Sequence, residues 1–369
     1  MRGPAARPVV IAAGGTGGHV FPAEALATEL VERGRRVALM TDARSGALNS
    51  PVFTAREQFV ISGAGIAGRG IVRAAKATGS LMLGVLQARR ILGRIDPAAV
   101  IAFGGYPSVA PVLAATLLRH RPPVVLHEQN AVLGRANRFL ARRATTLALS
   151  FEATKRMPAG LRTNVTGNPV RPAIAAIPPY EPPAEALHLV VLGGSLGARV
   201  FSDVVPAAVA LLPEELRTRL TVTQQCRAED LDRVRVAYTA TGVSAELSAF
   251  FPDVAGRLAS AHLVVARAGA STTAELTAAG RPAILVPLPG AIDDHQSANA
   301  RALDEARGAE MVAQRDLTPT SLSERLAAWL AKPDLLAQAA GAARRLGRPD
   351  AATRLADLVE ALIGQEART

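Results

Sequence analysis

Residues 264–300, VVARAGASTTAELTAAGRPAILVPLPGAIDDHQSANA, decide the fold of this chain. Residues 264–266 are apolar and predict the end of a buried strand. After a short turn, Ser271-Thr272-Thr273 supplies hydroxyl side chains of the kind that cap helix N-termini. The helix is expected to run from about 273 to 279, because Gly280 suits the position that ends a helix.

A second strand is expected at residues 283–286, since Pro282 cannot continue the helix, and a Pro-Gly loop follows at 287–290. A strand that feeds a helix aims unpaired backbone N–H groups and a positive dipole end at the strand's carboxyl end. This arrangement is an anion site, most naturally one for a phosphate.

Glu275 allows two interpretations. It stands three residues after Thr272, so its carboxylate could return to the Thr272 N–H in a capping box. Alternatively, it could accept both hydroxyls of a ribose beside the phosphate. The polar run at 293–299, just past the next strand, favours the ribose, because ligands of open α/β sheets collect at that edge.

The composition indicates a soluble globular protein of two or three domains. The chain has 369 residues, 49% of them hydrophobic, and a formal net charge of +11. Arginine carries nearly all the positive charge, and no zinc-finger or RNA-recognition pattern accompanies it, so the sequence does not predict a nucleic-acid partner. A single cysteine, Cys226, excludes an intramolecular disulfide. The apolar run at 9–13 is too short for a signal peptide, and no clean run of about 18 apolar residues occurs.

A glycine loop follows the first predicted strand. Residues 9–13 read as a buried strand, and Gly14-Gly15-Thr16-Gly17-Gly18-His19 comes directly after them. Val20 stands where the dinucleotide-binding pattern needs its third glycine, so that pattern is broken. The loop also lacks the Gly-Lys-Ser/Thr sequence of a P-loop. The loop is either a tight strand–helix turn or a place where a ligand approaches the backbone closely. Pro22 is expected in the first turn of the helix that follows.

Later strands of the first half end in polar or glycine-rich loops. A strand at 100–103 runs into Gly104-Gly105-Tyr106, and one at 124–126 runs into His127-Glu128-Gln129-Asn130. Carboxyl ends of parallel strands meet at one edge of a sheet, so these side chains are expected to gather there. Glu128 and Asn130 at the end of one apolar strand favour a functional cluster.

The chain divides at a proline-rich connection near 167–183. The pattern then restarts with a strand at 189–192 and a second glycine loop, Gly193-Gly194-Ser195-Leu196-Gly197-Ala198. We therefore expect an α/β protein with two Rossmann-like parallel-sheet domains facing each other across a cleft. The domains are expected at 1–168 and 169–349, with the last helix, about 350–369, packing back on the first.

Seven motifs in one order cover nearly the whole chain: Gly14 to His19, Gly104-Gly105-Tyr106, His127 to Asn130, Gly167-Asn168-Pro169-Val170-Arg171, Gly193 to Ala198, Arg267-x-Gly269-Ala270, and Asp294-His295-Gln296-x-x-Asn299. Together they resemble the MurG family of bacterial GT-B glycosyltransferases. The resemblance implies an inverting transferase that moves N-acetylglucosamine from UDP-GlcNAc to the muramoyl 4-hydroxyl of lipid I, giving lipid II for peptidoglycan. It also implies a peripheral protein on the cytoplasmic face of the cell membrane, beside other cell-wall and division proteins.

The resemblance assigns roles to individual residues. Donor binding falls to Ser195, Gly269, Ala270, Ser271 and Thr272, with Glu275 on the ribose. His295, Gln296 and Asn299 would read the sugar hydroxyls, and Asn130 and Arg171 would meet the donor from the first domain. The acceptor would face Thr16, Gly17, Gly18, Tyr106 and Glu128. The family more often carries glutamine at Leu196, and a leucine cannot donate a hydrogen bond to phosphate.

The reaction needs a base for the attacking hydroxyl and stabilisation of the departing UDP. His19 is the candidate base, because imidazole exchanges protons near neutral pH, and Glu128 is the alternative. His19 could instead make only a structural hydrogen bond within its loop. Two other functions stay open: a GT-B enzyme with a different lipid acceptor, and a non-catalytic scaffold that binds nucleotide sugars.

No metal or other cofactor is expected. Asp230-Leu231-Asp232 has the DxD spacing of metal-dependent transferases, but its polar helical context at 228–235 predicts solvated surface. Helix dipoles and arginines could stabilise the leaving diphosphate instead.

A membrane-docking patch is expected on a helix near residue 75. Arg69, Arg73 and Lys76 share one helical face, and the neighbouring apolar residues are Ile71, Leu81, Met82, Val85 and Leu86. A basic rim around an apolar patch suits an anionic leaflet that carries the lipid acceptor. The alternative is an ordinary helix that faces the core, since Trp and Tyr anchors are missing.

Overall fold

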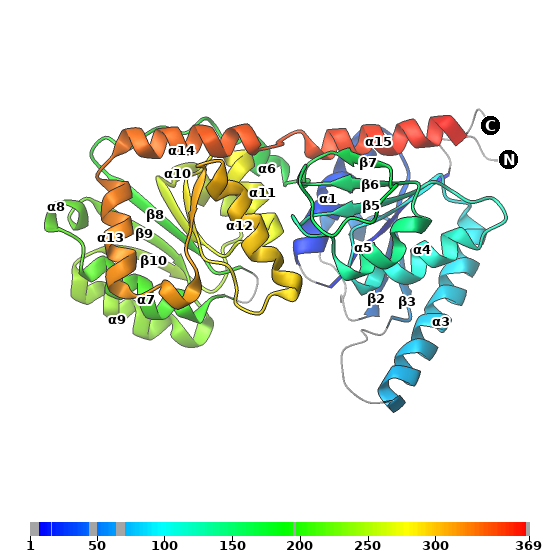
Figure 1. The fold of residues 1–369 in the computed structure, drawn as a ribbon, viewed down its shortest axis with the longest axis horizontal. Coiled ribbons are helices and arrows are strands. Elements are labelled where there is room, and N and C mark those ends of the chain that lie inside the picture. The colour runs from blue at the N-terminus through cyan, green and yellow to red at the C-terminus, as the bar shows by residue number, and fades with distance from the viewer. Residues whose placement is uncertain (1–6, 16, 44–49, 64–70, 195–196, 367–369) are drawn as a thin grey trace. The chain divides into compact units, whose positions relative to one another are not determined.

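The structure, a computed structural model, describes residues 7–15, 17–43, 50–63, 71–194 and 197–366, with only the backbone for 71–76. Two compact units form: unit 1 is Met1–Arg171 with Asp350–Thr369, and unit 2 is Pro172–Pro349 (Figure 1). The division thus follows Arg171, whereas the sequence placed it after Asn168. Thr16, Ser195 and Leu196 lie outside the described residues.

Unit 1 is built on a seven-stranded parallel sheet in the order β3-β2-β1-β4-β5-β6-β7. The strands are β1 (Val9–Ala12), β2 (Val37–Asp42), β3 (Glu57–Ile61), β4 (Ala99–Ala102), β5 (Val124–Glu128), β6 (Thr146–Leu149) and β7 (Thr163–Val165). Alternate residues of β1 enter different cores: Val10 packs with α3 and α4, and Ile11 packs with α1 and α15. Burial on both faces explains why the central strands β1 and β4 are continuous apolar runs, whereas the edge strands β3 and β7 are partly exposed and carry polar residues.

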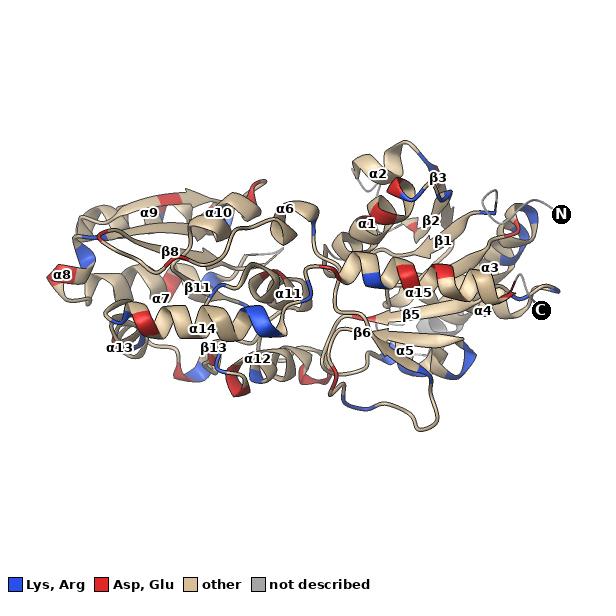
Figure 2. Ribbon diagram, turned by 90° about the horizontal axis from the view of Figure 1, so that it is seen from above, with Lys and Arg blue, Asp and Glu red and all other residues tan. Residues whose placement is uncertain are grey.

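The helices of unit 1 cover both faces of this sheet. They are α1 (Gly17–Glu32), α2 (Pro51–Thr54), α3 (Ile71–Ile95), α4 (Val109–Thr116), α5 (Arg135–Leu140) and α15 (Ala351–Glu366), with 3₁₀ turns η2 (Tyr106–Ser108) and η3 (Ala141–Arg143). The last helix does return to the first unit, where Leu355 and Val359 are fully buried against α1. Arg33, which follows α1 directly, bonds the carboxylates of Asp357 and Glu360 of α15. Figure 2 shows acidic positions along α15.

Unit 2 repeats the design with a six-stranded parallel sheet in the order β10-β9-β8-β11-β12-β13. Its strands are β8 (Leu187–Leu192), β9 (Leu220–Gln225), β10 (Ser244–Ser248), β11 (Leu263–Ala266), β12 (Ala283–Leu285) and β13 (Ala309–Met311). Its helices are α6 (Pro172–Ala175), α7 (Arg199–Ala210), α8 (Glu214–Arg217), α9 (Leu231–Thr241), α10 (Val254–Ser260), α11 (Ala270–Ala279), α12 (His295–Glu305), α13 (Pro319–Leu330) and α14 (Pro333–Leu346). Short 3₁₀ turns are η4 (Ala228–Asp230), η5 (Ile292–Asp294) and η6 (Gln314–Asp316).

The strand orders contain one reversal in each unit. β1 lies between β2 and β4, and β8 lies between β9 and β11. Ligands of open α/β sheets bind outside the carboxyl ends of the strands at such a reversal. The two glycine loops follow β1 and β8, and the Gly104 and Gly269 turns follow β4 and β11, so these loops occupy the two reversal points.

Two local predictions are wrong. Helix α11 begins at Ala270 with Gly269 as its N-cap, three residues earlier than expected. Thr272 is therefore inside the helix, and the capping box between Thr272 and Glu275 does not form. Helix α1 begins at Gly17, which places Pro22 in its interior rather than in its first turn. The predicted helix end at Gly280 is confirmed, with a left-handed φ of 62°.

Candidate active site

His19 lies in the first turn of α1, at the carboxyl edge of the unit 1 sheet. Its Nδ1 is 2.7 Å from the Phe103 carbonyl oxygen. A carbonyl can only accept a hydrogen bond, so Nδ1 carries the proton of the neutral imidazole and Nε2 keeps a free lone pair. The sequence left open whether this histidine bonds within its own loop; the structure gives it a partner at the end of β4 instead.

Two glycines leave room beside the His19 ring. Gly104 and Gly105 have φ values of 81° and 69°, a region that side chains rarely adopt. A Cβ on Gly105 would stand 3.5 Å from His19 Nε2, and one on Gly104 would stand 3.6 Å from His19 Cε1. The glycines therefore keep side chains away from the nitrogen that can act as a base. Tyr106 follows them with 45% of its surface exposed.

The end of β5 carries three consecutive buried polar residues. His127, Glu128 and Gln129 are each at most 2% exposed. Gln129 Nε2 donates to the Phe103 carbonyl at 2.9 Å and approaches His127 Nδ1 at 3.1 Å, while His127 Nε2 is 3.0 Å from the Gly167 carbonyl oxygen. Burial lowers the pKa of His127 to about 4. His19 and Gln129 thus share one carbonyl, within a network that keeps His127 neutral.

The Glu128 carboxylate is enclosed by donors from its own loop. Oε1 accepts from the Asn130 backbone N–H at 3.0 Å and from Asn130 Nδ2 at 3.1 Å. Oε2 accepts from the Gly134 N–H and from Asn137 Nδ2, both at 2.8 Å. A buried carboxylate with four such donors is suited to fix the loop that presents Asn130.

Arg171 ends unit 1 and lies against α1. Its guanidinium carbon is 5.3 Å from the centre of the Phe21 ring, a cation–π distance. A Cβ on Gly17 would touch the same ring at 3.0 Å. The structure therefore places Arg171 near the first glycine loop, as a basic group at this edge of the sheet.

The N-terminus of α11 is the corresponding feature of unit 2. The first helical hydrogen bond runs from the Thr273 N–H to the Gly269 carbonyl, so the preceding N–H groups face out of the helix end. Gly269 offers no side-chain cap, and the Ser271 hydroxyl has no hydrogen-bond partner among the described residues. Glu275 is 8% exposed, one helical turn further along. This end of the helix is suited to an anion.

The turn before α12 is strained. Asp293 and Asp294 both have φ values of 55°, which costs free energy in non-glycine residues and is common at functional sites. His295 Nδ1 is 2.7 Å from the Ile292 carbonyl oxygen, and Gln296 Oε1 accepts from the Leu288 N–H at 2.9 Å. Asn299 is fully buried, and its Nδ2 donates to the Ala268 carbonyl at 3.1 Å. Asn299 thus ties α12 to the β11–α11 turn. Its predicted contact with a sugar hydroxyl stays a prediction.

Sequence reasoning missed three side chains that hold these loops in place. Asn137 joins the Glu128 carboxylate to the His127 carbonyl. Gln225 bonds the second glycine loop. Arg267, 8% exposed, donates to the carbonyls of Val286 and Pro287 and to Gln314 Oε1. Each was visible as a polar residue at or just after the end of an apolar strand, or in the following helix. The partners of Gln225 and Arg267 are distant in sequence, but those of Asn137 are only 9 and 10 residues away.

The DxD residues separate in the structure. Asp232 is 97% exposed, but Asp230 is 5% exposed and pairs with Arg233 at 2.7 Å. The prediction of solvated surface is thus wrong for Asp230, because the first turn of α9 folds Arg233 over it. Among the described residues, no three His, Cys, Asp or Glu side chains gather as metal ligands.

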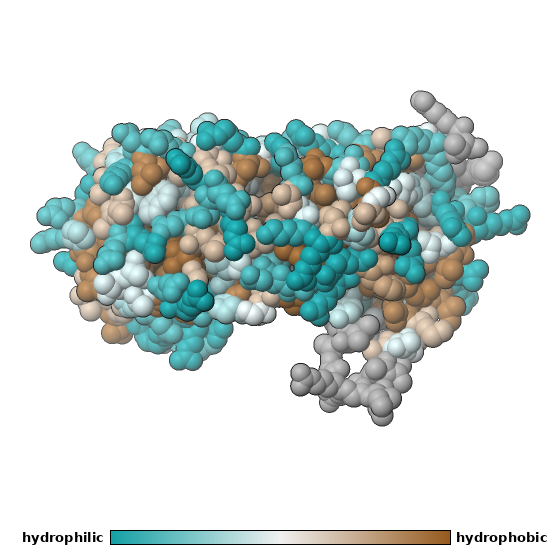
Figure 3. Space-filling model, in the orientation of Figure 1, coloured by the Kyte–Doolittle hydropathy of each residue, from teal (hydrophilic) through white to brown (hydrophobic). Residues whose placement is uncertain are grey.

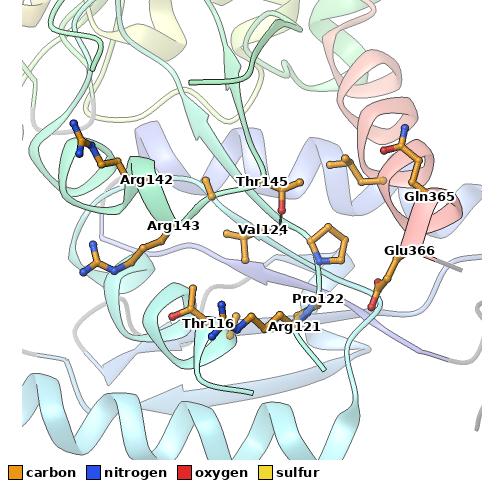
Figure 4. Close-up of a pocket in the computed structure, with 13 residues that line it drawn as sticks. Thr116, Arg121, Pro122, Val124, Arg142, Arg143, Thr145, Gln365 and Glu366 are labelled. Atoms are coloured by element: carbon orange, nitrogen blue, oxygen red, sulfur yellow. Dashed lines mark hydrogen bonds between the residues drawn. The ribbon is translucent and has the colours of Figure 1, made fainter. Parts of the chain in front are cut away.

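A hollow of about 510 Å³ lies in unit 1, at the amino-terminal ends of β5 and β6. Arg142 and Arg143 stand on one side of it and Gln365 and Glu366 of α15 on the other, with Val124 and Pro122 between them (Figure 4). It is at the opposite strand ends from the glycine loops, and none of the predicted site residues lines it. The other edge of each sheet, where the carboxyl ends of the strands meet the glycine loops, is called the loop edge below.

Comparison with known proteins agrees with this geometry. The glycosyltransferase family 28 N-terminal domain matches residues 9–149, and the family 28 C-terminal domain matches residues 188–355. The crystal structure of Acinetobacter baumannii MurG superposes with a TM-score of 0.80 and 30% identity, covering 96% of this chain and 99% of that one. The fold and the two loop edges thus define a two-domain glycosyltransferase.

Two relatives narrow the class. A UDP-N-acetylglucosamine–N-acetylmuramyl-(pentapeptide) pyrophosphoryl-undecaprenol N-acetylglucosamine transferase of Granulibacter bethesdensis is 62% identical over 97% of this chain and 94% of its own length. The Acidiphilium cryptum protein of the same name is 53% identical over the full length of both. The chain belongs to the MurG family. The GT-B, two-sheet α/β fold predicted from the sequence is confirmed.

Proposed function

We propose that this protein transfers N-acetylglucosamine from UDP-GlcNAc to the 4-hydroxyl of the muramoyl sugar of lipid I, giving lipid II for peptidoglycan synthesis. The observation that carries this proposal is 62% identity to a transferase of that name over nearly the whole of both chains. The geometry of the two loop edges supplies chemistry that the reaction needs.

The transfer is a displacement with inversion at the anomeric carbon. The acceptor oxygen forms a bond to that carbon, the bond to the UDP oxygen breaks, and the acceptor proton passes to a base. His19 Nε2 is the base, because the Phe103 carbonyl holds the proton on Nδ1 and the two glycines leave Nε2 accessible. UDP leaves with the electron pair.

Donor recognition falls to unit 2. The N-terminus of α11, from Gly269 to Thr272, faces the diphosphate, and its dipole offsets the charge that develops on UDP. Glu275 accepts the ribose hydroxyls. His295 and Gln296 contact the sugar hydroxyls, with Asn299 holding their helix in place. Because these backbone and side-chain donors stabilise the leaving group, the proposal requires no metal ion.

Acceptor recognition falls to unit 1. Gly17 and Gly18 let the lipid-linked pyrophosphate approach the start of α1, where N–H groups point outward. Tyr106, which is exposed, contacts the acceptor sugar. Asn130 and Arg171 are polar groups at the same edge and meet the donor phosphate or sugar. Glu128 acts by fixing Asn130 rather than as a base, since four donors already occupy its carboxylate.

The test is transfer of radiolabelled N-acetylglucosamine from UDP-GlcNAc to a short-chain lipid I analogue, with EDTA present. We expect transfer by the parent, and its loss in His19→Ala and Glu275→Ala. A diacylglycerol acceptor serves as the control, and no transfer to it is expected. UDP binding without transfer to any acceptor would contradict the proposal and favour a scaffold.

Peripheral membrane association is part of the proposal. No helix within the described residues is long and apolar enough to cross a membrane. On α3, Met82, Leu83 and Leu86 are 63%, 50% and 61% exposed. Figure 3 shows hydrophobic surface in the region of α3 and α4. Arg89 and Arg90 follow on the same helix, exposed and without an ion pair in the described part of the chain. Exposed apolar side chains beside arginines suit an anionic leaflet.

The predicted patch divides in the structure. Leu81 and Val85 are half-buried and pack against the core of unit 1, so they anchor α3 rather than meet lipid. The side chains of Ile71, Arg73 and Lys76 lie outside the described residues. The lipid-facing set is therefore Met82, Leu83 and Leu86.

Vesicle sedimentation tests this surface. We expect the parent to bind phosphatidylglycerol vesicles and the Met82→Asp/Leu86→Asp double variant to lose most of that binding. Val236→Asp on α9 is the matched control, because Val236 is 71% exposed but lies in unit 2. Equal binding by the double variant and the parent would contradict docking through α3.

A further inference from the structure

Gln225 is the last residue of β9 and reaches the loop that follows the neighbouring strand, β8. Its Oε1 accepts from the Gly193 N–H at 3.1 Å. Its Nε2 donates to the Gly194 carbonyl at 3.0 Å and to the Ala249 carbonyl at 3.2 Å. One amide therefore holds the start of the second glycine loop from both sides and ties it to the segment after β10.

The contacts fix where the backbone groups of the loop point. The Gly194 carbonyl also accepts from the Gly197 N–H at 3.0 Å, so two donors occupy its two lone pairs. Gly194 has a φ of 80°, a backbone conformation that glycine adopts readily and other residues rarely do. Because glycine is permissive, its own backbone preference does not fix the direction of this carbonyl. A carbonyl that turned toward a bound anion would repel it. Gln225 holds the Gly194 carbonyl away by giving it a donor within the protein.

The loop has little freedom to compensate if Gln225 is lost. A Cβ on Gly193 would stand 2.5 Å from the Ala198 nitrogen and 2.9 Å from Gly197 Cα, so the two ends of the turn touch. A Cβ on Gly197 would meet the Arg227 side chain at 3.0 Å, on the residue two after Gln225. The turn is thus packed against the end of β9, and the amide supplies the hydrogen bonds of that contact.

We propose that Gln225 is a positioning residue for the diphosphate of the nucleotide-sugar donor. It acts through Gly193, Gly194 and Ala249, and does not itself touch the ligand. The inference rests on the proposed function, since it takes the anionic ligand of unit 2 to be a nucleoside diphosphate sugar. Loss of the amide frees the Gly194 carbonyl and weakens binding of the phosphates, while a nucleoside without phosphates is little affected.

Calorimetric binding of UDP and of uridine to the full chain tests this directly. In Gln225→Met, which keeps the side-chain volume but not the hydrogen bonds, we expect UDP affinity to fall about tenfold. Uridine affinity should change less than about threefold, and the KM for UDP-GlcNAc should rise with little change in kcat. Gln225→Glu keeps the acceptor for Gly193 but loses both donors and adds a negative charge, so it should weaken UDP further.

Gln224→Ala is the matched control. Gln224 is fully buried and accepts a hydrogen bond from the Tyr238 hydroxyl. Its loss should therefore lower thermal stability, but any change in affinity should be the same for UDP and for uridine. Equal losses for UDP and uridine in Gln225→Met, or unchanged UDP binding, would overturn the inference while leaving the proposed function intact. A parent that binds no UDP would overturn both.

Discussion

The loop edges of the two units share a fold and differ in how their side chains are used. In unit 1, the partly buried His19 and the buried His127 and Glu128 lie at the ends of β4 and β5. Hydrogen bonds of Gln129 and Asn137 connect them. In unit 2, the loop edge instead holds Gln225 at the end of β9 and Arg267 after β11, whose amide and guanidinium bond backbone carbonyls. The first arrangement suits proton transfer and the second suits a rigid set of backbone donors. In our proposal, the same βαβ framework serves a base in one unit and an anion in the other.

The largest effect is expected from the carboxylate cage of unit 1. Glu128→Ala leaves four donors without their acceptor, so we expect the free energy of unfolding to fall by about 4 kcal/mol in urea titrations. Asp232→Ala is the control, because its carboxylate is 97% exposed and should cost less than about 0.5 kcal/mol. Unchanged stability together with a shifted acid limb in the pH–rate profile would instead make Glu128 the base.

Acid sensitivity should be the next largest effect. Burial lowers the pKa of His127 to about 4, from 6.5, and also lowers the pKa of His188 and of His262. The unfolded chain binds the proton first as the pH falls below about 6.5, so stability is full above that pH and declines until the folded His127 is protonated near pH 4. For His127 alone this amounts to about 2 kcal/mol between pH 7 and pH 5.

Urea midpoints at pH 7 and pH 5 measure this loss. His127→Gln removes the titrating ring but keeps a donor for the Gly167 carbonyl, so the variant should lose clearly less stability on acidification than the parent. The same loss in both proteins would show that His127 does not control the acid response.

A smaller and more specific effect is expected from two buried arginines of unit 2. Arg267 and Arg281 each donate to backbone carbonyls and lie over an aromatic ring, Phe201 or Tyr180. Arg267 follows β11 at the loop edge, whereas Arg281 precedes β12 at the opposite edge. Arg267→Met should therefore raise the KM for UDP-GlcNAc about tenfold.

Arg281→Met provides the comparison for Arg267→Met. It should lower thermal stability but leave the donor KM within about threefold of the parent. If both variants raised the donor KM equally, the loss of a buried guanidinium anywhere in unit 2 would explain the effect, and the special role of the loop edge would fail.

The sequence predicted both glycine loops and the strands that precede them, because buried parallel strands are continuous apolar runs and glycine marks the turns after them. It placed the start of α11 at about Thr273, since hydroxyl side chains are good N-caps. In the structure Gly269 is the N-cap, and the three hydroxyl residues lie inside the helix. The side chains that hold the loops could not be predicted. Gln225 and Gly193 are 32 residues apart in sequence, and only the strand order brings them together.

The same limit applies to buried polar residues. Asn299 was assigned to the sugar with His295 and Gln296 because the three share one motif, and that contact stays a prediction. Its hydrogen bond to the Ala268 carbonyl could not be read from the motif. Glu128 was an alternative base because it ends an apolar strand, yet its loop folds over it. Residue type and spacing indicated segments at the ends of the strands, whereas side-chain direction depended on the tertiary packing.

Single-turnover transfer to a lipid I analogue, measured over a range of UDP-GlcNAc concentrations, tests the division between the two units most directly. Arg267→Met should approach the parent rate when the donor is saturating, because its defect is in binding. His19→Ala should stay about 10³-fold slower at every donor concentration while binding UDP like the parent. A His19→Ala enzyme whose rate recovers at high donor, or never falls, would contradict the assignment of the base to unit 1.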